Sequence, residues 1–146
     1  MIIKTIVAFV ATFTFSILFK APTKHLLFCG IVGVVAYFTS ALLRFYGLNV
    51  ILATFLASVL LTIFARFFSY QRQAPATIFL IPGIFPLVPG TGIYYTASYI
   101  FANDYTAAMT KGVETMLIAG SLVVGLLFGM ALPKKWFTLF NRSSKT

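Results

Sequence analysis

The sequence predicts an all-α, polytopic membrane helix bundle of about five transmembrane helices, of which the fourth is discontinuous. Of the 146 residues, 60% are hydrophobic and only 9% are charged, and the mean hydropathy is +1.00. A soluble domain of this length cannot bury so much apolar surface. Apolar runs also recur along the chain near the ~20 residues that a crossing helix needs. The whole chain, 1–146, is therefore expected to form a single transmembrane domain.

The expected crossings follow one another with short connections, so consecutive helices should be antiparallel neighbours. Lys4 and the apolar run after it have the outline of a secretory signal, but no small-x-small cleavage site precedes a polar start. The first run is therefore expected to remain as a helix, and residues 133–146 should form a short basic cytoplasmic tail. The five segments are 2–19, 26–43, 48–68, 76–101 and 113–132.

Small and hydroxyl residues recur at helical spacing in the first, third and fifth segments. Such stripes let helix backbones approach closely, and helix packing is the interpretation that we favour. A hydroxyl-lined permeation path along the third segment is the alternative. Cys29, the one cysteine, is expected to be a small packing residue. The stripes are Ala8, Thr12 and Ser16; Thr54, Ser58 and Thr62; and Ser121, Gly125 and Gly129.

The fourth segment is interrupted by prolines and glycines. Proline removes a backbone donor and clashes with the preceding turn, whereas glycine relaxes the backbone. Freed backbone groups are tolerated in lipid only where protein or a water-filled cavity satisfies them. We therefore predict two half-helices, 76–82 and 92–102, that meet at an unwound core, a typical transporter binding site. A kink that serves only packing is the alternative. The interrupting residues are Pro82, Gly83, Pro86, Pro89, Gly90 and Gly92.

The start of the second half-helix is a candidate carboxylate site. Thr91 is expected to cap it through the side-chain hydroxyl. The free N–H groups around Gly90 and Gly92 should carry the positive end of the helix dipole, which favours an anion. Tyr95 and Ser98 follow Thr91 at i+4 and i+7, so one polar stripe is expected to lead away from the break.

Ionisable residues are scarce, and none forms a catalytic or metal-ligating constellation. Asp104 is expected in a solvated loop and Glu114 at the start of the last helix; either is a candidate for proton or ion coupling if it faces the bundle. Arg44 is expected on the same side of the membrane as Asp104 and Glu114, and is a candidate for attracting an anionic substrate or pairing with either acid. Gly90-Thr91-Gly92 lacks the lysine of a phosphate loop. We expect no enzyme, no cofactor and no metal.

The net charge of +9 indicates contact with lipid headgroups rather than nucleic acid, because the cations lie mostly between and after the apolar runs. Five crossings with the N-terminus outside divide the eleven cations eight to three, whereas a re-entrant fourth segment divides them six to five at best. The positive-inside rule therefore favours five crossings with a cytoplasmic C-terminus. The eight are Lys20, Lys24, Arg66, Arg72, Lys134, Lys135, Arg142 and Lys145, and the three are Lys4, Arg44 and Lys111.

The run PGIFPLVPGTGIY from Pro82 to Tyr94, followed by Asn103-Asp104 and a glycine-rich last helix, resembles the threonine/serine exporter family over roughly residues 75–132. The chain length is similar to the small-subunit form of that family. The resemblance implies export of threonine and serine, or of a dicarboxylate such as succinate, across the cytoplasmic membrane. It also implies a second five-helix subunit of the same family as partner. The implied signature residues are Pro82, Gly83, Pro86, Pro89 and Gly90.

We therefore predict a subunit of a secondary transporter that exports small carboxylate-bearing metabolites by alternating access around the broken helix. An ion gradient should drive export, because no ATP-binding element is present. The expected partners are the bilayer, the substrate, and a homologous subunit or further copies of this chain. Two alternatives stay open: a non-transporting interaction subunit for a larger membrane partner, and a small passive channel.

Overall fold

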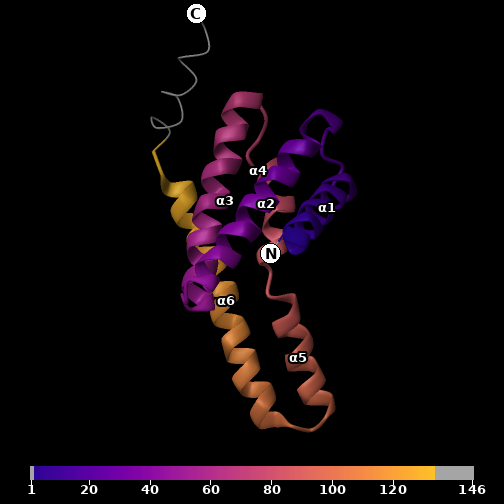
Figure 1. The fold of residues 1–146 in the computed structure, drawn as a ribbon, viewed down its shortest axis with the longest axis vertical. Coiled ribbons are helices and arrows are strands. Elements are labelled where there is room, and N and C mark those ends of the chain that lie inside the picture. Colours follow the sequence, from indigo (N-terminus) through magenta and orange to yellow (C-terminus); the bar gives the residue numbers. More distant parts are fainter. Residues whose placement is uncertain (1, 134–146) are drawn as a thin grey trace, which may run out of the picture.

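A computed structural model describes residues 2–133, which form helices joined by short connections (Figure 1). The basic tail predicted over 133–146 lies outside the described residues except for Pro133. The elements in chain order are α1 (Ile2–Leu18), η1 (Thr23–His25), α2 (Leu26–Phe45), α3 (Val50–Arg72), α4 (Thr77–Ile84), η2 (Phe85–Leu87), α5 (Gly90–Phe101) and α6 (Tyr105–Ala131), where η denotes a 3-10 turn.

The lengths and composition of these helices suit a protein that crosses the membrane several times. Among residues 2–133, three helices are long and apolar enough to cross: η1 with α2, then α3, then α6. The pair formed by α4–η2 and α5 passes the same test, but its two parts are inclined by 48°. The apolar α1 is shorter, so the count of five crossings stays a prediction.

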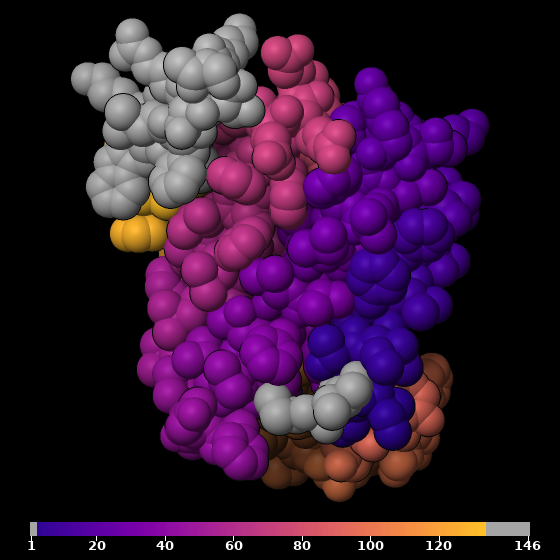
Figure 2. Space-filling model, turned by 45° about the horizontal axis from the view of Figure 1, so that its top comes forward, coloured from indigo at the N-terminus to yellow at the C-terminus, as the bar shows by residue number. Residues whose placement is uncertain are grey.

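The helices form a bundle from which a hairpin extends. α1, α2, α3 and α4 pack together, the second half of α6 lies along α3, and α5 packs mainly against α6. In Figure 1 the hairpin of α5 and the first half of α6 projects beyond the lower ends of α2 and α3. Figure 2 shows α1, α2 and α3 side by side on one face, with the hairpin emerging below them.

Four connections within residues 2–133, all except the link between η2 and α5, contain one residue with a left-handed backbone. The residues are Lys20, Gly47, Gln73 and Asn103, with φ of 54°, 85°, 50° and 59°. Only glycine and, less readily, asparagine adopt this conformation at little cost. One such residue at each turn keeps the connections short enough to make sequential helices antiparallel.

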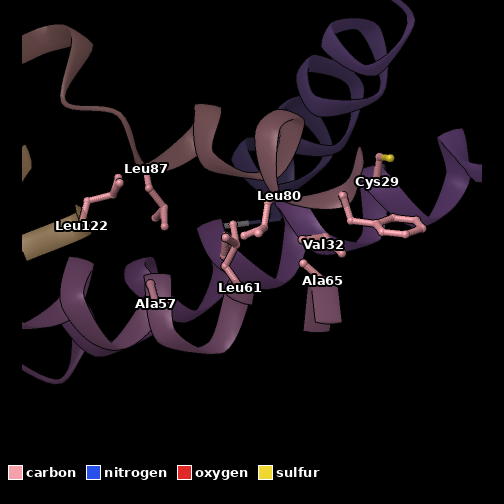
Figure 3. Packing of buried hydrophobic residues seen from close by; sticks show 10 residues of the cluster. Cys29, Val32, Ala57, Leu61, Ala65, Leu80, Leu87 and Leu122 are labelled. Carbon is pink, nitrogen blue, oxygen red and sulfur yellow. The ribbon is translucent and has the colours of Figure 1, made fainter. Parts of the chain in front are cut away.

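The bundle core lies between α2, α3 and α4. Val32 and Leu61 are fully buried, and Figure 3 shows Val32, Leu61 and Leu80 meeting between the helices. A Cβ on Gly83 would lie 2.9 Å from Val32 Cγ1 and 3.1 Å from Leu61 Cδ1, so glycine sets how closely α4 approaches. Pro82 is fully buried as well. Both residues therefore hold α4 against its neighbours.

Glycines face hydroxyl side chains where helices cross most closely. Each hydroxyl donates a hydrogen bond to a carbonyl of its own helix, at 2.7 to 2.8 Å, so it presents no unpaired polar group to the interface. These contacts confirm the predicted role in helix packing for part of each stripe: Thr12, then Ser58 and Thr62, then Gly125 and Gly129. The contacts are Gly33 on Thr12, Gly92 on Thr115, Gly125 on Ser58 and Gly129 on Thr62.

The break between α4 and α5 is narrower than predicted. The first half-helix, predicted to end at 82, continues to Ile84 and into η2, and the second begins at Gly90 rather than at 92. Only Val88 and Pro89 lie outside a helix, in extended or bent conformations. Proline is tolerated in the first turn of a helix, where its missing N–H needs no partner, so Pro86 fits into η2.

The proline inside α4 has a partner in a neighbouring helix. Pro82 has no N–H to donate to the carbonyl of Ile78, four residues earlier. The Cys29 thiol of α2 donates a hydrogen bond to that carbonyl at 3.3 Å. Groups freed by proline in membrane helices must find such substitutes. Cys29 thus has a role beyond the packing that the sequence predicted.

Replacing Cys29 with alanine is expected to lower the free energy of unfolding by about 1 kcal/mol, because the partly buried Ile78 carbonyl loses its donor. Replacing Cys29 with serine keeps a donor of similar size and should cost less. Thermal unfolding of both variants in the same detergent checks this. Equal stability of the two variants would contradict the role assigned to the thiol.

Arg66 departs from its predicted place as a cytoplasmic headgroup anchor. Its side chain is buried in the bundle, and Nη1 donates to the carbonyls of Gly129, Met130 and Leu132 at 2.9, 3.0 and 2.7 Å. The last carbonyls of a helix have no intrahelical donor and carry the negative end of its dipole. The physical reason is therefore helix capping: Arg66 closes the C-terminus of α6.

Candidate functional site: a polar cavity beside the helix break

A polar cavity of about 490 Å³ lies where the link between η2 and α5 faces α2, α3 and α6. Residues 86–92 form one wall, and the end of α2 and the start of α3 form another. The third wall is the first half of α6. The side chains and backbone that line it are those of Tyr37, Ser40, Ala41, Arg44, Val50, Thr54, Pro86, Leu87, Val88, Pro89, Gly90, Thr91, Gly92, Lys111, Glu114, Thr115 and Ile118.

The start of α5 presents backbone donors at this cavity. The carbonyls of Val88 and Pro89 accept hydrogen bonds from the N–H groups of Gly90 (2.8 Å) and Ile93 (3.1 Å), and not from those of Thr91 and Gly92. The N–H groups of a first helical turn carry the positive end of the dipole. The predicted cap by Thr91 is wrong: the N-cap is Pro89, without a side-chain bond, because α5 begins before Thr91.

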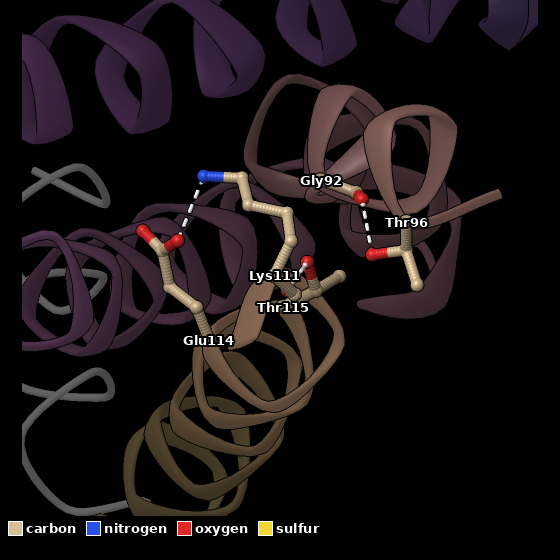
Figure 4. A network of polar contacts seen from close by, with 5 residues as sticks. All are labelled: Gly92, Thr96, Lys111, Glu114 and Thr115. Carbon is tan, nitrogen blue, oxygen red and sulfur yellow. Dashed lines mark hydrogen bonds and ion pairs between the residues drawn. The ribbon is translucent and has the colours of Figure 1, made fainter. Parts of the chain in front are cut away.

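Three charged side chains line the cavity, two cationic and one anionic. Lys111 Nζ lies 2.7 Å from Glu114 Oε2, an i,i+3 pair on α6 whose side chains are 36% and 45% exposed (Figure 4). Arg44, in the last turn of α2, has no ion pair with any residue in 2–133. The cavity therefore carries one positive charge in excess.

The close contact of α5 with α6 closes one side of this cavity. Gly92 is buried, and a Cβ there would lie 3.2 Å from the Thr115 Cβ and closer still to its hydroxyl. Thr115 Oγ1 donates to the Lys111 carbonyl at 2.7 Å, and Thr96 Oγ1 donates to the Gly92 carbonyl at 2.8 Å (Figure 4). Gly92 thus brings the start of α5 next to the charged pair.

The structure brings seven of the predicted site residues together and separates the rest. Pro82 and Gly83 belong to the bundle core, and Tyr95 and Ser98 lie exposed on α5 away from the cavity. Asp104 lies exposed in the short connection between α5 and α6, as predicted, and there it is the N-cap of α6. The seven that line the cavity are Arg44, Pro86, Pro89, Gly90, Thr91, Gly92 and Glu114.

The last helix begins at Tyr105 rather than near 113. The Asp104 carboxylate accepts a hydrogen bond from the Ala107 N–H at 3.0 Å, and this cap starts the helix early. Glu114 consequently lies in the third turn of α6, beside the cavity, rather than at the helix start.

Sequence reasoning missed Lys111, Tyr37 and Ser40 as cavity residues. The signal that could have identified them is a helical periodicity on α2 and α6, where the cavity-lining positions recur at i, i+3, i+4 and i+7. This spacing corresponds to one face of a helix. On α2 these positions are Tyr37, Ser40, Ala41 and Arg44, and on α6 they are Lys111, Glu114, Thr115 and Ile118. Thr54 of the third-segment stripe also lines the cavity, whereas Ser58 and Thr62 pack against α6.

In a comparison with known families, the chain matches the family model described as "Threonine/Serine exporter, ThrE" over residues 4–132. The match spans all the helices from α1 to α6, including the three that the resemblance in sequence left uncovered. No solved structure matches the chain.

Proposed function

Because the chain belongs to the threonine/serine exporter family, we propose that it is a subunit of a secondary transporter that exports small carboxylate-bearing metabolites through the polar cavity beside the α4–α5 break. The family is one of membrane exporters rather than enzymes. One observation carries the proposal for the site: a cavity with an excess positive charge lies at the start of α5, where the N–H groups of Thr91 and Gly92 have no backbone acceptor among residues 2–133. Threonine, serine and dicarboxylates such as succinate all carry a carboxylate, which such a cavity would bind.

In this proposal the substrate carboxylate binds between α5 and Arg44. The N–H groups of Thr91 and Gly92 supply directed donors, and the Arg44 guanidinium supplies a charge-assisted partner. Arg44 is exposed and unpaired, so it can engage a substrate without first breaking a contact within 2–133. Of the two candidate acids for ion coupling, this proposal favours Glu114, because Glu114 lines the cavity and Asp104 does not.

We place the protein in the inner membrane with five crossings, counting α1 and the bent α4–η2–α5 as one each. The N-terminus is then outside and the C-terminus cytoplasmic, in line with the positive-inside rule. In this orientation the end of α2 and the start of α6 face outward, so the cavity lies on the outer side of the break. Export proceeds by alternating access around it, together with a second five-helix subunit or a further copy of the chain.

One observation favours the alternative of a non-transporting interaction subunit. In the hairpin of α5 and the first half of α6, α5 packs mainly against α6, and the hairpin carries large exposed apolar side chains. A larger membrane partner that holds the pathway would cover such side chains. Among these exposed side chains are Ile93, Ile100, Met109, Val113 and Met116.

Reconstitution separates these functions. Proteoliposomes with the chain alone, or with its homologous second subunit, are loaded with labelled threonine or succinate, and efflux is followed under an imposed proton gradient. Arg44→Gln is expected to lower efflux at least about tenfold, because the substrate loses one charge-assisted hydrogen bond. Arg72→Gln is the matched control, because Arg72 lies over the Phe28 ring at the other end of α3.

Two results would contradict the proposal. One is absence of efflux from wild-type protein in both preparations. The other is efflux that needs the second subunit and is unchanged by Arg44→Gln, which would favour the interaction subunit. Efflux that does not change when the proton gradient is collapsed would indicate a passive channel.

A further inference from the structure

The one carboxylate that lines the cavity belongs to Glu114, and only one of its two oxygens has a hydrogen-bond partner within residues 2–133. Glu114 Oε2 is paired with Lys111, whereas no residue in 2–133 donates a hydrogen bond to Oε1. The side chain of Glu114 is 45% exposed, so this oxygen is not compelled to find a protein partner. It is an open acceptor next to a site built for anions.

The ion pair between Glu114 and Lys111 is of a kind that exchanges partners readily. Lys111 and Glu114 are both more than a third exposed, and pairs of this kind contribute little to stability. They stand one helical turn apart on α6, on the face that lines the cavity. A ligand that supplies an ammonium for Glu114 and a carboxylate for the cationic side of the cavity could therefore replace Lys111 as the partner of Glu114.

An α-amino acid is the ligand with this charge pattern, since its ammonium and carboxylate are held on one carbon. We infer that Glu114 is the specificity-determining residue that recognises the substrate ammonium, while Arg44 and the start of α5 hold the carboxylate. This inference rests on the proposed function and deepens it. In the empty cavity the Lys111–Glu114 pair is neutral and Arg44 supplies the excess positive charge; the carboxylate of a zwitterion would balance Arg44 while its ammonium pairs with Glu114. A dicarboxylate would instead bring a second negative charge next to Glu114.

The test compares two ligands that differ only in the ammonium group: L-threonine, and 3-hydroxybutyrate, which has the same carbon skeleton without the amine. Binding and efflux of both are measured with wild-type protein, Glu114→Gln, Arg44→Gln and Asp104→Asn. Glutamine keeps the shape of Glu114 and removes the charge. Asp104→Asn is the matched control, because it changes the other acid of the chain, whose oxygen caps α6 outside the cavity.

Glu114→Gln is expected to weaken threonine binding by tenfold or more and to leave 3-hydroxybutyrate binding unchanged or stronger. Arg44→Gln should weaken both ligands, and Asp104→Asn neither. Equal weakening of both ligands by Glu114→Gln, or no effect on threonine, would overturn the assignment of Glu114. If Arg44→Gln also leaves both ligands unaffected, or wild-type protein binds neither, the proposed function fails as well.

Discussion

Replacing Gly125 with alanine should destabilise the protein more than any other single-methyl change along α6. A Cβ at this position would lie 2.6 Å from the backbone carbonyl oxygen of Phe55 and would overlap the Ser58 hydroxyl. The carbonyl belongs to the α3 backbone, so no side-chain rotation relieves the contact and α6 must move away from α3. Overpacking of this kind costs about 1–3 kcal/mol, occasionally more. The expected drop in melting temperature is roughly 5 °C or more.

The measurement is thermal unfolding in detergent, followed by the fraction that stays monodisperse after heating. Gly120→Ala is the matched control on the same helix, because a Cβ there meets nothing within 4 Å. Alanine is the better helix former, so this variant should be as stable as wild type or slightly more so. Equal melting temperatures for Gly120→Ala and Gly125→Ala would refute the close α3–α6 contact.

Replacing Gly90 with leucine should abolish transport while the protein still folds and enters the membrane. Gly90 lines the cavity at the first position of α5, and a Cβ there would meet nothing within 4 Å. The backbone conformation suits any L-residue, so the substitution brings no strain. A leucine side chain would occupy the space in front of the free N–H groups and displace a carboxylate from them.

Efflux from proteoliposomes, normalised to the amount of folded protein, checks this expectation. Gly90→Ala is the control: it adds one methyl group to the same open space and should retain most of the efflux. The melting temperatures of both variants should match that of wild type. Full efflux from Gly90→Leu would exclude the start of α5 as the substrate site.

Much of the architecture follows from local rules that a sequence displays directly. Hydropathy and helical spacing predicted the α-helical class and placed the helices to within a few residues, except where capping by Asp104 began α6 early. The prolines and glycines between 82 and 92 surround the link between η2 and α5, where the two helical parts are inclined by 48°. That these parts form one discontinuous crossing stays a prediction. Stripes such as Ser121, Gly125 and Gly129 indicated close helix packing, which Gly125 and Gly129 make with α3.

The candidate site was only partly predictable. Local chemistry identified the start of α5 as a place for an anion and singled out Arg44 and Glu114. It did not separate Gly83, which packs in the core, from Gly90, which lines the cavity. It also missed Lys111, because a lysine near a helix end reads as a headgroup anchor until its neighbours are known.

The sequence alone determined that this protein is a membrane helix bundle with an interrupted fourth apolar segment, because burial in lipid and the backbone limits of proline and glycine act within a few residues. Only the tertiary structure decided which groups meet. Cys29 reaches the carbonyl freed by Pro82, and Arg66 caps a helix more than sixty residues away. Arg44, the start of α5 and the Lys111–Glu114 pair come to share one cavity. These contacts depend on how helices that are distant in sequence pack against one another, and local sequence patterns do not determine that packing.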